Sequence, residues 1–290
     1  MVDNAVFWGA CCAIAWGFSD FIARFAGRSV GVIAATFAMM TIGTVLVGLT
    51  IVIDGQALNL HLQGIHWLII MGIGVGLGSI LFYHAVTNGP VAIAAPVVSC
   101  YPAIAIPISI VFGSQPNNIV WVAMAVTLSG VWVVARMGPK SVEGNTEFSP
   151  HVIRRTILYS LLAATIWGVS LQFADLAIEE YGPTQTLLAM RIIGVIILAI
   201  AMFLRKESFK FSFNVWPILI IWSLLDTGGH LFLFLGLATE HGEYAIIASV
   251  GYTIVTVLLA RFILKEQVSL PQWGGIALVI SGVALLNFFN

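Results

Sequence analysis

Long apolar runs alternate with short polar breaks along nearly the whole chain. Helical runs of about 20 apolar residues are long enough to cross the hydrocarbon core of a bilayer. The breaks fall at charged residues or at Gly, Pro and Asn, and they divide the sequence into ten such runs. We therefore predict ten membrane-spanning helices, over residues 4–23, 31–53, 66–86, 91–112, 119–137, 156–178, 183–204, 214–237, 243–264 and 271–289.

The composition restricts the class of protein further. Of the 290 residues, 60% are hydrophobic and 9% are charged, whereas a soluble domain carries about 25% charged residues. This excludes a disordered chain, and the lack of a basic face excludes a nucleic-acid-binding protein. Cys11, Cys12 and Cys100 lie in apolar runs, where buried thiols are expected rather than a disulfide framework. The prediction is an all-α, polytopic membrane protein.

The two halves of the chain resemble each other. At an offset of 151, Trp16-Gly17-x-Ser19 matches Trp167-Gly168-x-Ser170, and at 152, Ser129-Gly130-Val131 matches Ser281-Gly282-Val283. At 153, alanines and glycines between residues 85 and 95 also match. The polar stretch 138–155 reads as a linker between repeats 1–137 and 156–290. Because each repeat has five spans, an odd number, the second must enter the membrane from the opposite side, as in the inverted repeats of secondary transporters.

Charge supports opposite orientations. Arg24 and Arg28 follow the first span, whereas Glu179 and Glu180 follow its counterpart. Eleven of the twelve Lys and Arg residues fall on one side of the predicted topology, and Arg191 is the exception. The positive-inside rule makes that side cytoplasmic. The linker is then cytoplasmic and both termini are non-cytoplasmic, in the plasma (inner) membrane.

Several strings resemble the EamA-type family of the drug/metabolite transporter superfamily. Ala85-x-x-x-Gly89-x-x-Ala92-x-Ala94 precedes and enters the fourth span. The second half has Ala238-x-x-x-Gly242, Arg261-Phe-Ile-Leu-Lys-Glu266 and Gly274-Gly-Ile-Ala-Leu-Val-Ile-Ser-Gly-Val283. The family's glutamate before the last span matches Glu266, and Ser114 occupies the first-half position. The length and the aromatic-rich spans are similar to YddG-type exporters of amino acids, including aromatic ones. The resemblance implies ten spans and transport.

Few ionisable groups lie within the predicted spans, and such groups are costly there. Asp226 and His230 are four residues apart and share a helix face. They form either a polar, proton-linked patch on a cavity wall or a pair that only joins helices. Arg191 either binds a solute carboxylate or forms an ion pair with Asp175 or Asp226. Asp20 and Asp175 are expected to reach the interface.

Aromatic and proline residues suggest a cavity wall. Trp16 and Trp167 recur in the middle of matching spans, where they can form a stacking surface. Pro96, Pro102 and Pro107 predict a bent helix that lines the cavity, and span 243–264 contributes polar groups without a proline. The predicted substrate-binding residues are Trp16, Ser19, Tyr83, His84, Ser99, Tyr101, Trp167, Arg191, Asp226, His230 and Tyr252.

These features predict a secondary transporter that works by alternating access around a midplane cavity. The chain has no Walker A string, so the gradient of the solute or of protons would supply the energy. A small neutral or zwitterionic, partly apolar solute, such as an amino acid, fits the expected wall. No catalytic residue, metal site or cofactor is predicted. The alternatives are an intramembrane enzyme that uses Asp226 and His230, and a channel.

Overall fold

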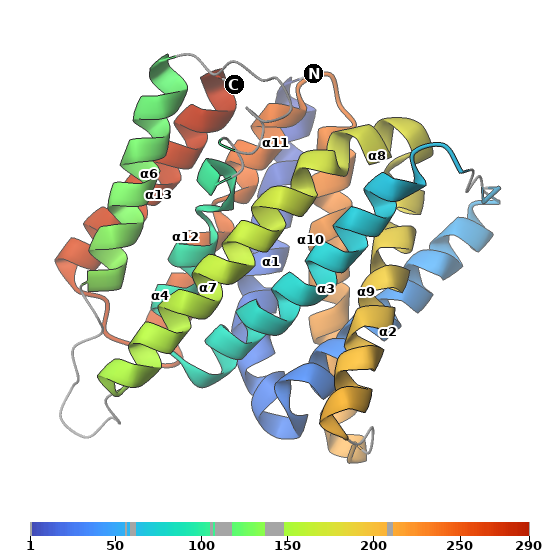
Figure 1. Ribbon diagram of the computed structural model, residues 1–290, viewed down its shortest axis with the longest axis horizontal. Helices are drawn as coiled ribbons and strands as arrows, with labels where there is room; N and C mark the ends of the chain where they lie inside the picture. Colours follow the sequence, from blue (N-terminus) through green and yellow to red (C-terminus); the bar gives the residue numbers. More distant parts are fainter. Residues whose placement is uncertain are drawn as a thin grey trace.

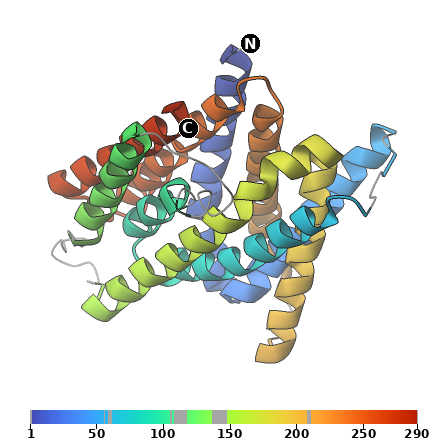
Figure 2. The same ribbon diagram turned by 45° about the horizontal axis from the view of Figure 1, so that its top comes forward.

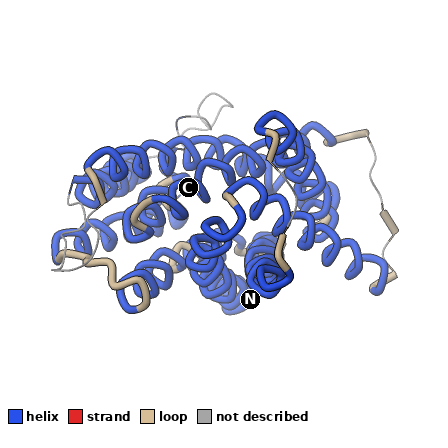
Figure 3. The backbone as a smooth tube through the Cα atoms, turned by 90° about the horizontal axis from the view of Figure 1, so that it is seen from below, coloured by secondary structure: helices blue, strands red, loops and turns tan. Residues whose placement is uncertain are grey.

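The computed structural model describes residues 2–55, 57–58, 62–104, 107, 118–136, 148–207 and 211–289. Within these ranges the chain forms helices and short connections, without a strand (Figures 1 and 3). The all-α fold class is therefore confirmed. The first half contains α1 (Val2–Val30), α2 (Val32–Ile53), α3 (Ile65–Asn88), α4 (Val91–Val98) and α6 (Asn118–Arg136). The second half contains α7 (Pro150–Ser170), η1 (Leu171–Phe173), α8 (Ala174–Tyr181), α9 (Pro183–Arg205), η2 (Phe213–Val215), α10 (Trp216–Leu237), α11 (Gly242–Ser249), α12 (Tyr252–Phe262) and α13 (Leu270–Phe289).

Eight helical stretches in the described residues are long and apolar enough to cross a membrane. They fall on eight of the ten predicted spans. Two shorter apolar helices, Val91–Ile104 and Leu270–Leu285, lie in the predicted fourth and tenth spans. Part of the fourth span, residue 137 of the fifth, and residues 138–147 of the predicted linker lie outside the described ranges.

The outer surface of the bundle is apolar. On α2, Val45 and Leu49 are 54% and 51% exposed, and on α9, Ile196 and Ile200 are each 51% exposed. Each pair is four residues apart, so both members lie on one face of their helix. Exposed apolar stripes of this kind suit contact with lipid.

Corresponding helices of the two halves run in opposite directions (Figure 1). In that view α1 descends whereas α7 rises, and α2 rises whereas α9 descends. The first residue of α1 and the last residue of α13 lie near the same end of the bundle. Arginines gather at the opposite end, at the close of α1 and α9 and the start of α7.

Helix contacts are exchanged between the halves. α1 packs on α10, and its counterpart α7 packs on α3, the counterpart of α10. Two helices pack on their own counterparts, α2 on α9 and α6 on α13. These two pairs form opposite edges of the bundle (Figures 1 and 2). The middle of the bundle is therefore built jointly by both halves.

Glycines at equivalent positions allow these close contacts. A Cβ at Gly130 of α6 would meet the backbone of Gly275 in α13, and one at Gly282 would meet the backbone of Ala123. Gly130 and Gly282, like Ala123 and Gly275, are 152 residues apart. The contact is thus reciprocal at the offset that the sequence predicts for these helices.

Equivalent turns also use glycine. Gly31 joins α1 to α2 with φ 90°, and Gly182 joins α8 to α9 with φ 78°. Positive φ at both sites favours a residue without a Cβ. The helix is longer than the predicted first span, because the span was expected to end at about residue 23, whereas α1 continues to Val30.

The offset of 153 that the sequence suggests for residues 85–95 also differs from the structure. The bounds of α4, Val91–Val98, and of α11, Gly242–Ser249, differ by 151 at both ends. The matches at an offset of 153 are therefore two residues out of step with the helices. Small residues are abundant in this region and match readily in the wrong register.

Candidate functional site

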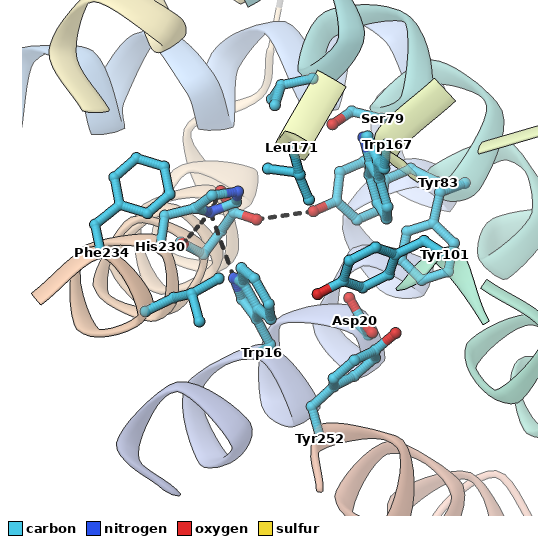
Figure 4. A pocket seen from close by; sticks show the side chains of 14 residues that line it. Trp16, Asp20, Ser79, Tyr83, Tyr101, Trp167, Leu171, His230, Phe234 and Tyr252 are labelled. Atoms are coloured by element: carbon cyan, nitrogen blue, oxygen red, sulfur yellow. Dashed lines mark hydrogen bonds and ion pairs between the residues drawn. The ribbon is translucent and has the colours of Figure 1, made fainter. Parts of the chain in front are cut away.

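A cavity lies between the two halves in the middle of the bundle (Figure 4). About 620 Å³ of space among its lining residues is not filled by protein atoms, a volume that includes open solvent at the mouth of the cavity. The wall consists of Trp16, Asp20, Val75, Ser79, Phe82, Tyr83, Tyr101, Trp167, Leu171, Asp226, His230, Leu233, Phe234 and Tyr252. Most of these side chains are aromatic or aliphatic.

The wall residues form seven pairs, each separated by the same 151 positions. The pairs are Trp16 with Trp167, Asp20 with Leu171, Val75 with Asp226, Ser79 with His230, Phe82 with Leu233, Tyr83 with Phe234, and Tyr101 with Tyr252. Each described wall residue therefore has its counterpart in the same wall. The two halves therefore contribute equivalent positions to one shared cavity.

The carboxylates and the imidazole of the described wall come from pairs whose two residues differ in type. Asp20 faces the cavity where the second half has Leu171. Asp226 and His230 stand where the first half has Val75 and Ser79. The aromatic frame is thus common to both halves, and the polar chemistry is asymmetric.

A helix break in each half brings one tyrosine to the cavity. α4 contains Pro96 and ends at Val98, and helix resumes at Tyr101 after a turn. α11 ends at Ser249, and α12 begins at Tyr252. Proline removes a backbone donor from the first break. The prediction of a bent wall in the first half is correct, but a matching break in the second half, without a proline, was not expected.

Two tryptophans stack against glycines of the opposite half. A Cβ at Gly229 of α10 would overlap the indole of Trp16, and a Cβ at Gly78 of α3 would overlap the indole of Trp167. Gly78 and Gly229 are again 151 residues apart. The absence of a side chain at both positions sets the depth of each indole in the wall.

Asp226 is held by an ion pair and a hydrogen bond. Nη2 of Arg191 donates to Oδ2 at 2.6 Å, and the Tyr83 hydroxyl donates to Oδ1 at 2.9 Å. The side chain of Arg191 is 1% exposed and that of Asp226 is 4% exposed. Arg191 lies behind Asp226 and is not among the wall residues. Of its two predicted roles, the structure therefore supports the ion pair with Asp226.

His230 has two competing partners for one ring nitrogen. Its Nδ1 lies 2.9 Å from the backbone carbonyl oxygen of Asp226 and 3.4 Å from Nε1 of Trp16. A carbonyl only accepts and an indole N–H only donates, so Nδ1 cannot serve both at once. The shorter contact favours a protonated Nδ1 that donates to the carbonyl. A hydrogen bond from Trp16 to Nδ1 therefore needs the other tautomer of His230, and the buried Nε1 of Trp167 has no partner among the described residues.

Seven of the eleven predicted residues are brought together in the wall, and four are not. Arg191 is one of the four. Another, Ser19, accepts a hydrogen bond from Nε1 of Trp222 at 3.1 Å. The hydroxyl of Ser99 donates to the Pro96 carbonyl oxygen at 2.9 Å. His84 contacts the Asn88 amide at 2.9 Å and lines a separate hollow near the end of α3. Ser19, His84, Ser99 and Arg191 therefore lie outside the wall as the structure describes it.

Seven wall residues were not predicted, and one of them contradicts an expectation. Asp20 was placed at the membrane interface, but it is 6% exposed and lines the cavity. The others are Val75, Ser79, Phe82, Leu171, Leu233 and Phe234. Applying the offset of 151 to Tyr83 finds Phe234, but no sequence signal marks the apolar positions as facing inward. In the described part of the chain, no three His, Cys, Asp or Glu side chains gather as a metal site requires.

One helical turn beyond Asp20, Arg24 joins the two halves. Its Nη1 donates to the Gly89 carbonyl oxygen at 2.7 Å and to Glu266 Oε1 at 3.0 Å. The Glu266 carboxylate also accepts from the backbone N–H groups of Val91 at 3.1 Å and Ala92 at 2.9 Å, at the start of α4. Burial raises the pKa of Glu266, while the Ala92 N–H and Arg24 act to lower it. This cluster closes the arginine-rich end of the bundle.

Comparison with known families agrees with the repeat. The EamA-like transporter family matches residues 3–136 and again residues 154–288. The chain belongs to the EamA-like transporter family. It is accordingly a membrane transporter of the drug/metabolite superfamily.

Relatives of this EamA-like chain are similar to parts of it. An uncharacterised protein of Methanocaldococcus jannaschii is 31% identical over 135 residues, which are 46% of this chain and 97% of that protein. A probable 4-amino-4-deoxy-L-arabinose-phosphoundecaprenol flippase subunit of Pseudomonas fluorescens is 51% identical over 39 residues, 13% of this chain and 33% of that subunit. A solved crystal structure has a TM-score of 0.67 at 17% identity and covers 98% of this chain and 96% of its own. That likeness concerns the fold.

Proposed function

We propose that this EamA-like protein is a secondary transporter that exports small, partly apolar metabolites through the central cavity. Amino acids, including aromatic ones, are the proposed solutes. The observation that carries the proposal is that the wall consists of seven residue pairs, each separated by 151 positions. A cavity built equally by two halves, with a broken helix in each, is the recurrent site of secondary transporters.

We further infer that residues 1–137 and 156–290 are two inverted five-helix repeats, joined by a cytoplasmic linker over 138–155. Opposite helix directions (Figure 1) and exchanged helix contacts support this arrangement. Rocking of one repeat against the other would then open the cavity to each side in turn. A gradient of solute or protons would drive the cycle.

The chemistry of the wall supports solutes of this character. Trp16, Trp167, Tyr101 and Tyr252 offer ring surfaces for an apolar or aromatic group. The described wall residues include no lysine or arginine, so a strongly anionic solute would lack a counter-charge among them.

Counterflow in proteoliposomes tests the proposal. Vesicles that contain the purified protein are loaded with unlabelled tryptophan, phenylalanine, methionine or threonine and diluted into the labelled amino acid. We expect transient accumulation of label for the aromatic amino acids, and none in protein-free vesicles. If no member of the panel accumulates, the amino-acid assignment is wrong.

A further inference from the structure

The carboxylate of Asp20 enters the cavity from α1, one helical turn beyond Trp16. It is 94% buried, because only 6% of the residue is exposed. Figure 4 shows it on the side of the cavity where Tyr101 and Tyr252 present their hydroxyls. Those tyrosines follow the two helix breaks, so Asp20 lies where the broken segments of both halves meet.

Asp20 has no counter-ion among the residues that the structure describes. No described side chain donates a hydrogen bond to it, and no described cation pairs with it. The arginine one turn away, Arg24, is engaged by Glu266 and the Gly89 carbonyl. Asp226, the other carboxylate of the cavity, is in contrast satisfied by Arg191 and Tyr83.

The groups that face Asp20 do not supply a positive charge. α3 contributes the phenol of Tyr83, and α12 and the segment after α4 contribute Tyr252 and Tyr101. α10 contributes Asp226, already paired, and His230, whose Nδ1 is directed at a backbone carbonyl. The fold does not require an acid here either, since the equivalent position in the other half is Leu171.

A buried carboxylate without a partner is costly when ionised, and it binds either a proton or a cation. The faces of Trp, Tyr and Phe rings attract an organic cation, most strongly when water is excluded. Asp20 shares the wall with seven such rings, of Trp16, Phe82, Tyr83, Tyr101, Trp167, Phe234 and Tyr252. An acid within an aromatic enclosure is suited to an ammonium group.

We propose that Asp20 is the cation site of the cavity: it binds the ammonium group of the solute, and it holds a proton when that group is absent. Binding then releases the proton, as the neutral acid and R–NH₃⁺ become a carboxylate–ammonium pair and one H⁺. The proposal rests on the proposed transport of amphipathic solutes, and it names the chemical group they share. It also makes cation entry and proton departure a one-for-one exchange at a single side chain.

The test is calorimetric binding to the purified full-length protein in detergent at about neutral pH. The probes are phenethylamine and 3-phenylpropionate, which have the same apolar part and opposite charges. Repeating each titration in buffers of different ionisation enthalpy gives the number of protons released. We expect phenethylamine to bind with release of about one proton, and 3-phenylpropionate to bind at least about tenfold more weakly. Removing one member of a buried charge pair costs about 2–5 kcal/mol, so Asp20→Asn should weaken phenethylamine binding about thirty-fold or more and abolish proton release.

Two further variants guard against a general effect of mutation. Asp20→Glu keeps the carboxylate and should retain proton release. Asp54→Asn removes an exposed acid at the end of α2, far in sequence from the wall, and should bind as the wild type does. Wild-type binding without proton release, the absence of phenethylamine binding, or equal binding by Asp20→Asn would overturn the proposal.

These results are separable from the proposed function. Loss of amino-acid counterflow with intact proton release would contradict amino-acid transport but not the cation site. Intact counterflow with an unchanged Asp20→Asn titration would contradict the cation site alone.

Discussion

Trp16 and Trp167, 151 residues apart, each place an indole ring against a glycine of the opposite half of the chain. A side chain at either glycine would overlap the ring that faces it. The relationship links helix packing directly to the shape of the cavity. It also provides two equivalent sites at which the same substitution can be made.

Gly78→Ala and Gly229→Ala should each displace one indole, because the new methyl group would overlap the ring. Overpacking of this kind costs about 1–3 kcal/mol. We expect both variants to lower the unfolding temperature in detergent and to reduce tryptophan counterflow. Gly274→Ala is the matched control, since nothing lies within 4 Å of a Cβ there. Wild-type behaviour of both cavity variants would show that the indole positions do not shape the site.

The ion pair of Arg191 and Asp226 should behave as a structural unit. Arg191→Met alone leaves a buried carboxylate without its cation, which costs about 3–5 kcal/mol. The equivalent first-half residues are Met40 and Val75. Adding Asp226→Val therefore recreates the apolar arrangement of the first half, and we expect it to restore most of the stability. A thermal-unfolding double-mutant cycle measures this, and a double variant less stable than Arg191→Met would contradict it.

Glu266 should give the stability a pH dependence that Glu266→Gln lacks. Burial raises the pKa of Glu266 above its ordinary value of 4.5. The folded protein therefore binds a proton at this site more readily than the unfolded chain does, and stability from this group falls as pH rises above about 4.5. Subtracting the unfolding profile of Glu266→Gln from that of the wild type isolates the effect. A difference that grows in the opposite direction would mean that Arg24 outweighs burial.

The arginine-rich end of the bundle should face the cytoplasm. Arg28, Arg154, Arg155 and Arg205 lie at that end, and the positive-inside rule assigns it to the cytoplasmic side. Reporter domains fused to one terminus at a time should therefore report the non-cytoplasmic side from both termini. Two cytoplasmic readouts would reverse the orientation, and opposite readouts would contradict an even number of spans.

The sequence predicts the aromatic frame of the cavity better than its acidic groups. Trp16 with Trp167 recurs as a string in both halves, and the spacing of Asp226 and His230 correctly indicates their contact. Asp20 was misplaced because Arg24 and Arg28 mark a polar end of the first apolar run. Arg24 is in fact buried against Glu266, a long-range contact that no local pattern reveals, so α1 extends further and Asp20 lies deeper.

Other wall residues were missed for a different reason. α3 is apolar or glycine on most faces, so periodicity does not show which face lines the cavity. Gly74 and Gly78 face α7, whereas Gly72 and Gly76 face α9. Only the packing of both neighbours reveals that Val75, Ser79 and Phe82 point inward. The constant offset of 151 at the wall likewise emerges from geometry, since small-residue matches favoured 153 nearby.

The central claim is that this two-fold wall is the transport site, reached alternately from both sides of the membrane. Ser79→Cys, in a variant whose three native cysteines are replaced by alanine, places one thiol in the wall with little change of size. A membrane-impermeant thiol reagent is applied to either side of oriented vesicles, with and without tryptophan. We predict labelling from both sides, slowed by tryptophan in each case. Labelling from one side alone, at a rate that tryptophan does not alter, would contradict the account.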